Sequence, residues 1–195
     1  MRIVMLTVLA ASLGGGACKK DDKGGPKEAA KPEAAAPEKP ASQLLTPGAE
    51  LPALDTVAHD GTALKSSELK GAPLVVYFYP KDETGGCNAE AEAFRDAKPE
   101  LDKLGAKLVG VSLDTVEAHK AFAEGHQLNF PLIADPEQKV TKAFGVPVQE
   151  GYADRVTFVF GPDGKVAKVW PDVSVDGHAA EVVAAVRDAS AKPAP

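Results

Sequence analysis

The chain has 195 residues, a net charge of −6 and a hydrophobic content of 44%. No basic cluster occurs beyond isolated lysines, so nothing in the charge pattern supports binding to nucleic acid. No apolar run reaches the roughly 20 residues that a membrane-spanning helix needs.

The N-terminus has the features of an export signal. Arg2 precedes an apolar stretch at 3–13, which small residues follow, and this pattern predicts a secretory signal peptide over residues 1–17. Cys18 comes next and resembles the lipid-bearing cysteine of a bacterial lipobox, although Gly15 stands where a lipobox usually has leucine. The alternative is cleavage by ordinary signal peptidase near the glycines. We expect an exported periplasmic or cell-envelope protein, anchored to a membrane as a lipoprotein through Cys18.

Residues 18–47 form a segment rich in Pro, Ala, Lys and Glu with few large apolar side chains. Such a segment cannot bury enough surface to offset the entropy of folding, so we predict a disordered tether. A flexible coil of this length spans about 30 Å. Residues 191–195 are predicted to form a flexible tail. The remaining segment, 48–190, has about 140 residues, which suits one domain.

The domain begins with a predicted hairpin, in which extended segments at 51–57 and 62–64 flank the turn sequence Asp60-Gly61. Residues 74–79 form a continuous apolar run rich in β-branched and aromatic residues, which is typical of a central strand buried on both faces.

A loop and a helix follow this strand. Pro80 cannot continue the ladder of a central strand, and the pair Gly85-Gly86 allows the backbone to turn tightly. The apolar spacing after this pair predicts a helix with Cys87 in its first turn, and Pro99 is expected to bend or interrupt that helix.

Strands and helices alternate in the rest of the chain. The predicted strands lie at 107–113, 130–134, 156–160 and 166–170, and the predicted helices at 115–125, 137–144 and 178–189. The alternation predicts an α/β fold with a mixed central sheet flanked by helices on both faces.

Cys87 is the strongest candidate for chemistry. At the start of a helix, free backbone N–H groups and the positive end of the helix dipole favour a thiolate, which is the nucleophilic form of cysteine. Thr84, three residues earlier, can aim its hydroxyl at the sulfur or at a bound oxygen atom. The alternative is that Cys87 is a small buried hydrophobic residue, but its place between a strand, a glycine pair and a helix favours chemistry.

These residues resemble a known family. Pro80, Thr84 and Cys87 match the peroxiredoxin pattern P-x-x-x-T-x-x-C, and the string 78–82, with Glu90 and Phe94 after it, resembles the bacterioferritin comigratory protein (Q-type) branch. The similarity covers nearly all of residues 48–190 and includes the segments 109–112, 129–132, 143–146, 155–159 and 162–164.

The resemblance implies a thioredoxin-like fold and a thiol peroxidase without metal or organic cofactor. Cys87 would attack the terminal oxygen of hydrogen peroxide or an organic hydroperoxide and become a sulfenic acid. Arg155 would stabilise the thiolate and polarise the peroxide, Thr84 would bind the substrate, Pro80 would shield the sulfur, and Glu90 would orient the arginine. Without the resemblance, each of these two residues has a simpler interpretation. Arg155 would be a surface strand residue in an ordinary ion pair, and Glu90 would be a favourable charge in the first helical turn.

Two positions depart from the family pattern. Glu92 stands where many members of this branch have a resolving cysteine, and Gly85 stands where they often have proline. We therefore expect the sulfenic acid to be reduced by an external thiol, from a thioredoxin-like protein or a small molecule, or by Cys18 if that residue remains free. Lipid attachment would block Cys18 as a thioether. The expected assembly is a monomer or weak dimer.

Two other functions share some of these features. A membrane-tethered thioredoxin-like thiol–disulfide oxidoreductase needs a C-x-x-C pair, but Thr84 and Glu90 occupy both positions three residues from Cys87. A degenerate, non-catalytic binding module is disfavoured because Pro80, Thr84, Cys87 and Arg155 are all present.

The histidines do not suggest a metal site. They are scattered and lack a ligand spacing, so a zinc site is disfavoured and we expect them at the surface. They are His59, His119, His126 and His178.

Overall fold

The computed structural model describes residues 44–191. The predicted signal peptide, Cys18, most of the predicted tether and the last four residues of the predicted tail lie outside the described residues.

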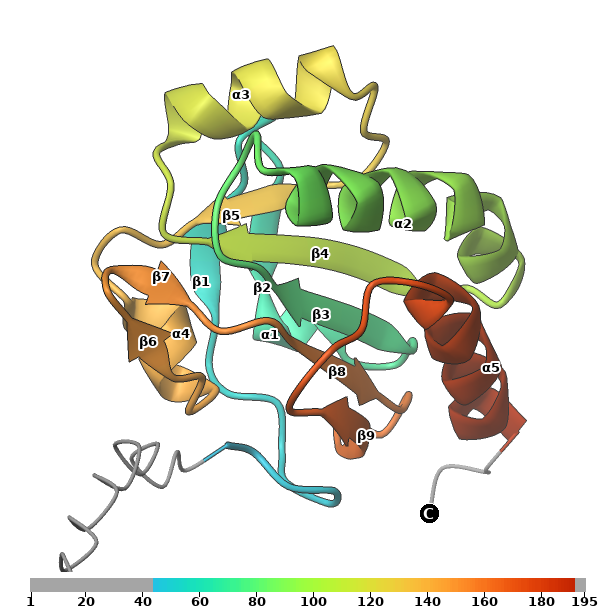
Figure 1. The fold of residues 1–195 in the computed structure, drawn as a ribbon. Coiled ribbons are helices and arrows are strands. Elements are labelled where there is room, and N and C mark those ends of the chain that lie inside the picture. The colour runs from blue at the N-terminus through green and yellow to red at the C-terminus, as the bar shows by residue number, and fades with distance from the viewer. Residues whose placement is uncertain (1–43, 192–195) are drawn as a thin grey trace, which may run out of the picture. The chain divides into compact units, whose positions relative to one another are not determined.

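A five-stranded sheet in the order β5-β4-β3-β8-β9 forms the centre of the domain (Figure 1). Strands β3, β4 and β5 run parallel, whereas β8 pairs antiparallel with both β3 and β9. The mixed sheet predicted from the alternating elements is therefore confirmed. The strands are β3 (Leu74–Phe78), β4 (Lys107–Ser112), β5 (Leu132–Ala134), β8 (Val156–Phe160) and β9 (Val166–Trp170).

Helices cover both faces of this sheet. On one face, α2 (Gly85–Lys103), α3 (Val116–Gly125) and α5 (His178–Ala191) pack against Val75 and Tyr77 of β3. The opposite face packs against α1, α4 and the β1–β2 hairpin through alternate residues of β3, among them Val76. The elements on this second face are α1 (Ser66–Leu69), α4 (Lys139–Ala143), β1 (Asp55–Val57) and β2 (Ala63–Lys65).

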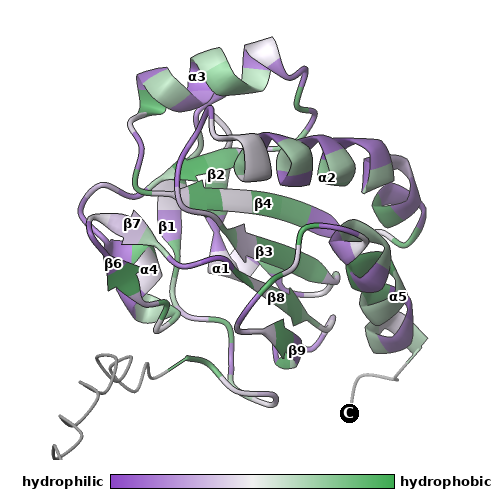
Figure 2. Cartoon of the chain, in the orientation of Figure 1, coloured by the Kyte–Doolittle hydropathy of each residue, from purple (hydrophilic) through white to green (hydrophobic). Residues whose placement is uncertain are grey.

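Two covered faces explain why β3 and β8 are apolar at nearly every position. All five residues of each strand are buried, and both strands are hydrophobic along much of their length in Figure 2. Burial on both faces removes the polar–apolar alternation that a half-exposed strand shows.

The predicted hairpin is confirmed, with Thr56 paired to Leu64. Its first strand is shorter than the predicted 51–57, and its second strand is shifted by one residue from the predicted 62–64. Three short elements were not predicted from the sequence: α1 and the strands β6 (Val148–Gln149) and β7 (Tyr152–Ala153). Each has two to four residues, too few for a hydrophobic period to be recognised.

The expectation that Pro99 would bend or interrupt its helix is wrong as regards interruption, because α2 continues through Pro99 to Lys103. Proline removes the N–H that would bond to the carbonyl of Arg95. The side-chain amide of Asn129 donates to that carbonyl at 3.4 Å, so the oxygen keeps a partner.

None of the helices in the described part of the chain combines the length and hydrophobicity needed to cross a membrane.

Gly110 allows β4 to lie close to its neighbours. A Cβ atom there would be 2.7 Å from a methyl group of Leu132 and 2.9 Å from the ring of Tyr77. Both neighbours are fully buried, so neither has free space to move into.

We predict that Gly110→Ala lowers the free energy of unfolding by about 1–3 kcal/mol, because overpacking forces buried side chains from their rotamers. The matched control is Gly85→Ala, since no atom lies within 4 Å of the added methyl group and its effect should be small. Urea denaturation of both variants measures the difference. Equal stability of the two variants would contradict the close packing at Gly110.

Candidate active site

Cys87 lies in the first turn of α2, as predicted, and only 2% of its surface is exposed. The buried strand β3 ends at Phe78, a loop follows, and α2 begins at Gly85. The backbone N–H groups of a first helical turn lack intrahelical partners and favour an anion. The sulfur therefore sits where backbone polarity stabilises a thiolate.

Arg155 contacts this sulfur from a distant part of the sequence. Its Nη2 donates a hydrogen bond to Cys87 Sγ at 3.2 Å. Arg155 immediately precedes β8, whose first residue, Val156, pairs with Phe78 at the end of β3. The antiparallel register thus brings the arginine to the loop that precedes α2 and Cys87.

Gly86 leaves room for the guanidinium group, since a Cβ at that position would lie 3.4 Å from Arg155 Nη2. A longer side chain there would crowd the contact between the arginine and Cys87. Gly86 therefore has a steric role beside the arginine. The tight backbone turn expected at the glycine pair is not observed, because both glycines lie in α2 without a positive φ, and Glu83 before them has a φ of 56° instead.

Glu90 holds the other side of the guanidinium group. Its Oε2 accepts a hydrogen bond from Arg155 Nη1, and the residue is 1% exposed. Burial raises the pKa of Glu90 to about 7, and the attraction of Arg155 only partly offsets this rise. For Arg155 itself, burial acts to lower the pKa, but the charges of Glu90 and Cys87 and their hydrogen bonds raise it overall.

Thr84 and Pro80 lie in the loop between β3 and α2. The Thr84 hydroxyl donates to the carbonyl oxygen of Lys81 at 3.0 Å and makes no capping bond to the helix. Because its proton is engaged, its oxygen remains available as an acceptor for an O–H group. Thr84 is exposed, one residue before α2, and Pro80 is half-buried in the loop that leads to it. Among the predicted site residues, hydrogen bonds join Cys87, Arg155 and Glu90.

Glu92, which stands five residues after Cys87 at the position of a resolving cysteine in many members of the Q-type branch, belongs to an ion pair. Its Oε1 lies 2.8 Å from Nδ1 of His126, and this hydrogen bond is the main cause of a raised His126 pKa. Across residues 44–191, Cys87 is the single free cysteine.

The expectation that the histidines lie at the surface is wrong for His59, His119 and His178, which are 8%, 0% and 2% exposed. Each has a hydrogen-bond partner that the sequence alone does not reveal. His59 Nδ1 accepts from the Leu132 amide at 3.0 Å, and His178 Nε2 lies 2.8 Å from Thr157 Oγ1. Burial lowers the pKa of His178 to about 4.

No group of three or more His, Cys, Asp or Glu residues in the described part of the chain is arranged to hold a metal ion.

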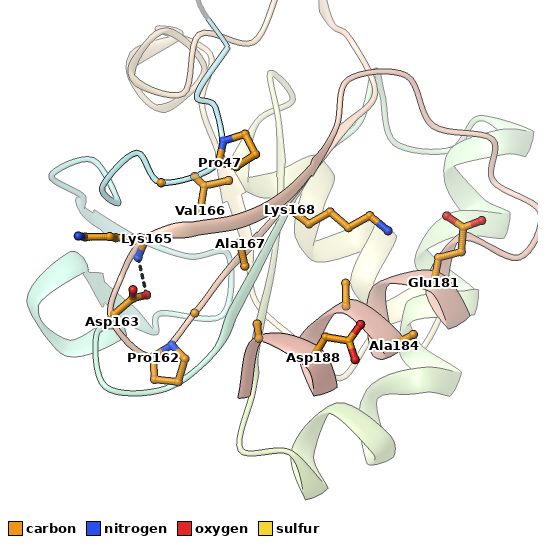
Figure 3. A pocket seen from close by; sticks show the side chains of 14 residues that line it. Pro47, Pro162, Asp163, Lys165, Val166, Ala167, Lys168, Glu181, Ala184 and Asp188 are labelled. Atoms are coloured by element: carbon orange, nitrogen blue, oxygen red, sulfur yellow. Dashed lines mark hydrogen bonds between the residues drawn. The ribbon is translucent and has the colours of Figure 1, made fainter. Parts of the chain in front are cut away.

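A cavity of about 800 Å³ lies between β9, α5 and the segment at Pro47 (Figure 3). Its lining combines alanines of α5 with charged residues of both signs, among them Lys168, Glu181 and Asp188. None of its lining residues belongs to the group around Cys87.

Comparison with known proteins gives a consistent result. The model of the AhpC/TSA family matches residues 47–169, more than half of the chain. The chain is 38% identical to peroxiredoxin Bcp of Bacillus subtilis over 152 residues, which cover 74% of this chain and 97% of that protein.

Solved structures show the same similarity. A structure of the Xanthomonas campestris bacterioferritin comigratory protein, studied for its alkyl peroxide reduction activity, has a TM-score of 0.67 and 37% identity, covering 70% of this chain and 92% of that one. A cysteine-to-serine mutant of peroxiredoxin Q from the same organism has a TM-score of 0.69 and 34% identity, covering 74% and 99% of the two chains. These similarities confirm the thioredoxin-like fold.

We predict that Glu90→Gln changes how stability depends on pH. The folded-state pKa of Glu90, about 7, lies above the ordinary glutamate pKa of 4.5, so the folded state binds more protons than the unfolded state between these two pH values. This contribution to the free energy of unfolding is fully present below about pH 4.5 and is lost as pH rises through 7, by about 3 kcal/mol. The stability of the native chain relative to Glu90→Gln should fall accordingly between pH 4.5 and 8 in denaturant titrations. A difference that stays constant with pH would show that burial does not hold a proton on Glu90.

Proposed function

The chain belongs to the AhpC/TSA family and is a peroxiredoxin, a thiol-dependent peroxidase, and on that premise we propose that Cys87 is its peroxidatic nucleophile. The observation that carries this assignment is the 3.2 Å hydrogen bond from Arg155 to the sulfur, with the same guanidinium group held by buried Glu90. A merely structural buried cysteine needs no such charged partner.

The reaction follows from this arrangement. The Cys87 thiolate attacks the terminal oxygen of a hydroperoxide, an S–O bond forms and the O–O bond breaks. The sulfur is oxidised by two electrons to a sulfenic acid, and the leaving alkoxide or hydroxide takes a proton to become an alcohol or water. Arg155 supplies positive charge where negative charge develops on the breaking O–O bond, which is the usual role of a preorganised donor.

Thr84 and Pro80 complete the proposed substrate site. The Thr84 oxygen, with its own proton bonded to Lys81, accepts a hydrogen bond from the terminal O–H of the peroxide. Pro80 lacks an N–H and shields the sulfur without offering water a donor. The alkyl peroxide reduction described for the X. campestris relative supports organic hydroperoxides, besides hydrogen peroxide, as substrates.

Reduction of the sulfenic acid requires a thiol from outside the folded domain. Cys87 and Cys18 are the two cysteines of the chain, and Glu92 replaces a thiol at the nearby helical position. An external thiol forms a mixed disulfide with Cys87 and releases water, and a second thiol then restores the Cys87 thiol and leaves the reductant as a disulfide. The absence of a second cysteine from 44–191 disfavours dithiol exchange as the main activity.

We also propose export and attachment to a membrane through lipid-modified Cys18, in the periplasm or cell envelope. The support is the basic residue, apolar stretch and small residues before Cys18. Lipid attachment blocks the sulfur of Cys18, which leaves Cys87 as the one reactive thiol of the mature protein. The proposed assembly is a monomer or weak dimer.

The proposed peroxidase activity is tested with the full chain carrying Cys18→Ser, so that Cys87 is the one thiol. We predict that one equivalent of hydrogen peroxide rapidly converts Cys87 to a sulfenic acid. Rapid-quench samples, analysed by mass spectrometry, measure the rate of this conversion. Cys87→Ser should abolish oxidation, and Arg155→Ala should slow it by about 100-fold, as loss of a transition-state donor does. Excess peroxide should drive Cys87 to sulfinic acid because no internal thiol intercepts it.

Arg187→Ala, an exposed substitution on α5, is the matched control and should leave the rate unchanged. Oxidation no faster than that of a free thiol would reject the peroxidase assignment. An unchanged rate in Arg155→Ala would reject the role of the arginine alone.

Membrane attachment has a separate test. We predict that the full chain, expressed in a bacterium with lipoprotein processing, is recovered in the membrane fraction with a mass increase on the peptide that begins at Cys18. Cys18→Ser should move the protein to the soluble fraction. Recovery of both proteins in the soluble fraction, without a mass increase, would reject the anchor.

A further inference from the structure

A buried polar network lies beneath the loop between β3 and α2, outside the group of residues that contact Cys87. Its centre is Asp82, which is 5% exposed although it lies in a surface loop. Asp82 Oδ1 accepts a hydrogen bond from the Tyr79 hydroxyl at 2.8 Å, and Oδ2 lies 2.8 Å from His119 Nδ1. The backbone N–H of Asp82 donates to Asp114 Oδ2 at 2.9 Å.

His119 connects this loop to the sheet. It is fully buried on α3, and its Nε2 lies 3.1 Å from the carbonyl oxygen of Ile133 on β5. The two ring nitrogens therefore bridge the Asp82 carboxylate and the backbone of β5, which fixes the loop relative to the sheet.

The polar groups around this pair come from several elements. They are the hydroxyl of Tyr79, which follows β3, the carboxylate of Asp114, which follows β4, and the Ile133 carbonyl on β5. Ser112 Oγ donates to Asp114 at 2.7 Å and fixes that carboxylate in turn. The pair is thus tied to β5 and to the residues that follow β3 and β4, and the loop is held at Asp82 on both its side chain and its backbone.

This anchoring acts on Thr84 through one peptide group. The Asp82 N–H and the Lys81 carbonyl belong to the same planar peptide unit, so the bond to Asp114 sets the direction of that carbonyl. The Lys81 carbonyl accepts the proton of the Thr84 hydroxyl at 3.0 Å. Glu83 lies between Asp82 and Thr84 in the sequence. Its φ of 56° falls in a region that non-glycine residues avoid unless their surroundings impose it.

We propose that His119 is a positioning residue for the peroxidase reaction: through Asp82 it fixes the Lys81–Asp82 peptide group, which orients the Thr84 hydroxyl toward the incoming hydroperoxide. The inference rests on the proposed function. His119 touches neither the sulfur nor the substrate, and its effect is specific to reactions in which Thr84 binds an O–H group.

The test compares two reactions of Cys87 in the full chain carrying Cys18→Ser. One is oxidation by hydrogen peroxide, and the other is alkylation by iodomethane, a small electrophile without an O–H group for Thr84 to bind. We expect His119→Gln to slow oxidation by about tenfold and to change alkylation by less than about twofold. A general loosening of the fold would move both rates together.

A double-mutant comparison identifies the route. Thr84→Val should slow oxidation, and adding His119→Gln to Thr84→Val should cause no further loss, because residues that act through one contact are not additive. Thr141→Val is the matched control, since Thr141 is also fully buried and donates to a carboxylate, that of Asp135, at 2.7 Å. It should lower stability without changing the ratio of the two rates. Asp114→Asn, which acts on the same peptide group from a less buried position, replaces His119→Gln if that variant does not fold.

The possible results separate this inference from the function on which it rests. Slow peroxide oxidation in the native site would reject the peroxidase assignment itself. If the native site is oxidised fast, three results overturn the inference and leave the peroxidase assignment standing. In His119→Gln, the oxidation and alkylation rates fall in parallel, or the oxidation rate is unchanged. In the double mutant, the losses of His119→Gln and Thr84→Val add.

Discussion

The antiparallel pairing of β3 with β8 is the constraint on which the site depends. It places the end of one buried strand beside the start of another, so that the loop after Phe78 faces the residue before Val156. Arg155 and Cys87 are 68 positions apart in sequence, and this register alone brings them into contact. A shift of one residue would turn the side chains of β8 to the opposite face and remove the guanidinium group from the sulfur.

The electrostatics of the site are organised around Arg155. One guanidinium group serves two buried acidic groups, the Cys87 thiol and the Glu90 carboxyl, through different nitrogens. Arginine suits this task because its planar group presents several donors in fixed directions and remains charged when buried, whereas lysine presents a single ammonium. Glu90 is nearly inaccessible to water, so burying the Glu90–Arg155 ion pair costs desolvation energy. The contribution of this ion pair is therefore to hold the guanidinium group at one angle to the sulfur.

The sequence predicts the fold where a local pattern reflects the burial, as in the apolar strands β3 and β8. It also places Cys87 in a first helical turn from the strand, loop and helix order alone. The roles of Arg155 and Glu90 came from a family resemblance, because their meeting depends on strand register, which no local pattern encodes. The buried histidines escaped prediction for the same reason: His119 and Asp82 are 37 positions apart, and an isolated histidine in a sequence does not show its partner.

The buried sulfur places a requirement on the reducing half of the reaction. The first turns of α2 are held by Glu90 on one side and, through Glu92 and His126, on the other. Cys87 is 2% exposed, so a thiol as large as a protein side chain cannot reach its sulfur without local movement. The exposed residues Glu83 to Gly86, at the end of the loop and the start of α2, lie next to Cys87 in the chain, and we expect a reducing thiol to enter by their movement. Thr84 belongs to the same segment, so such a movement would also displace the oxygen that we propose binds the peroxide, and oxidation and reduction of Cys87 would then need different arrangements of this segment.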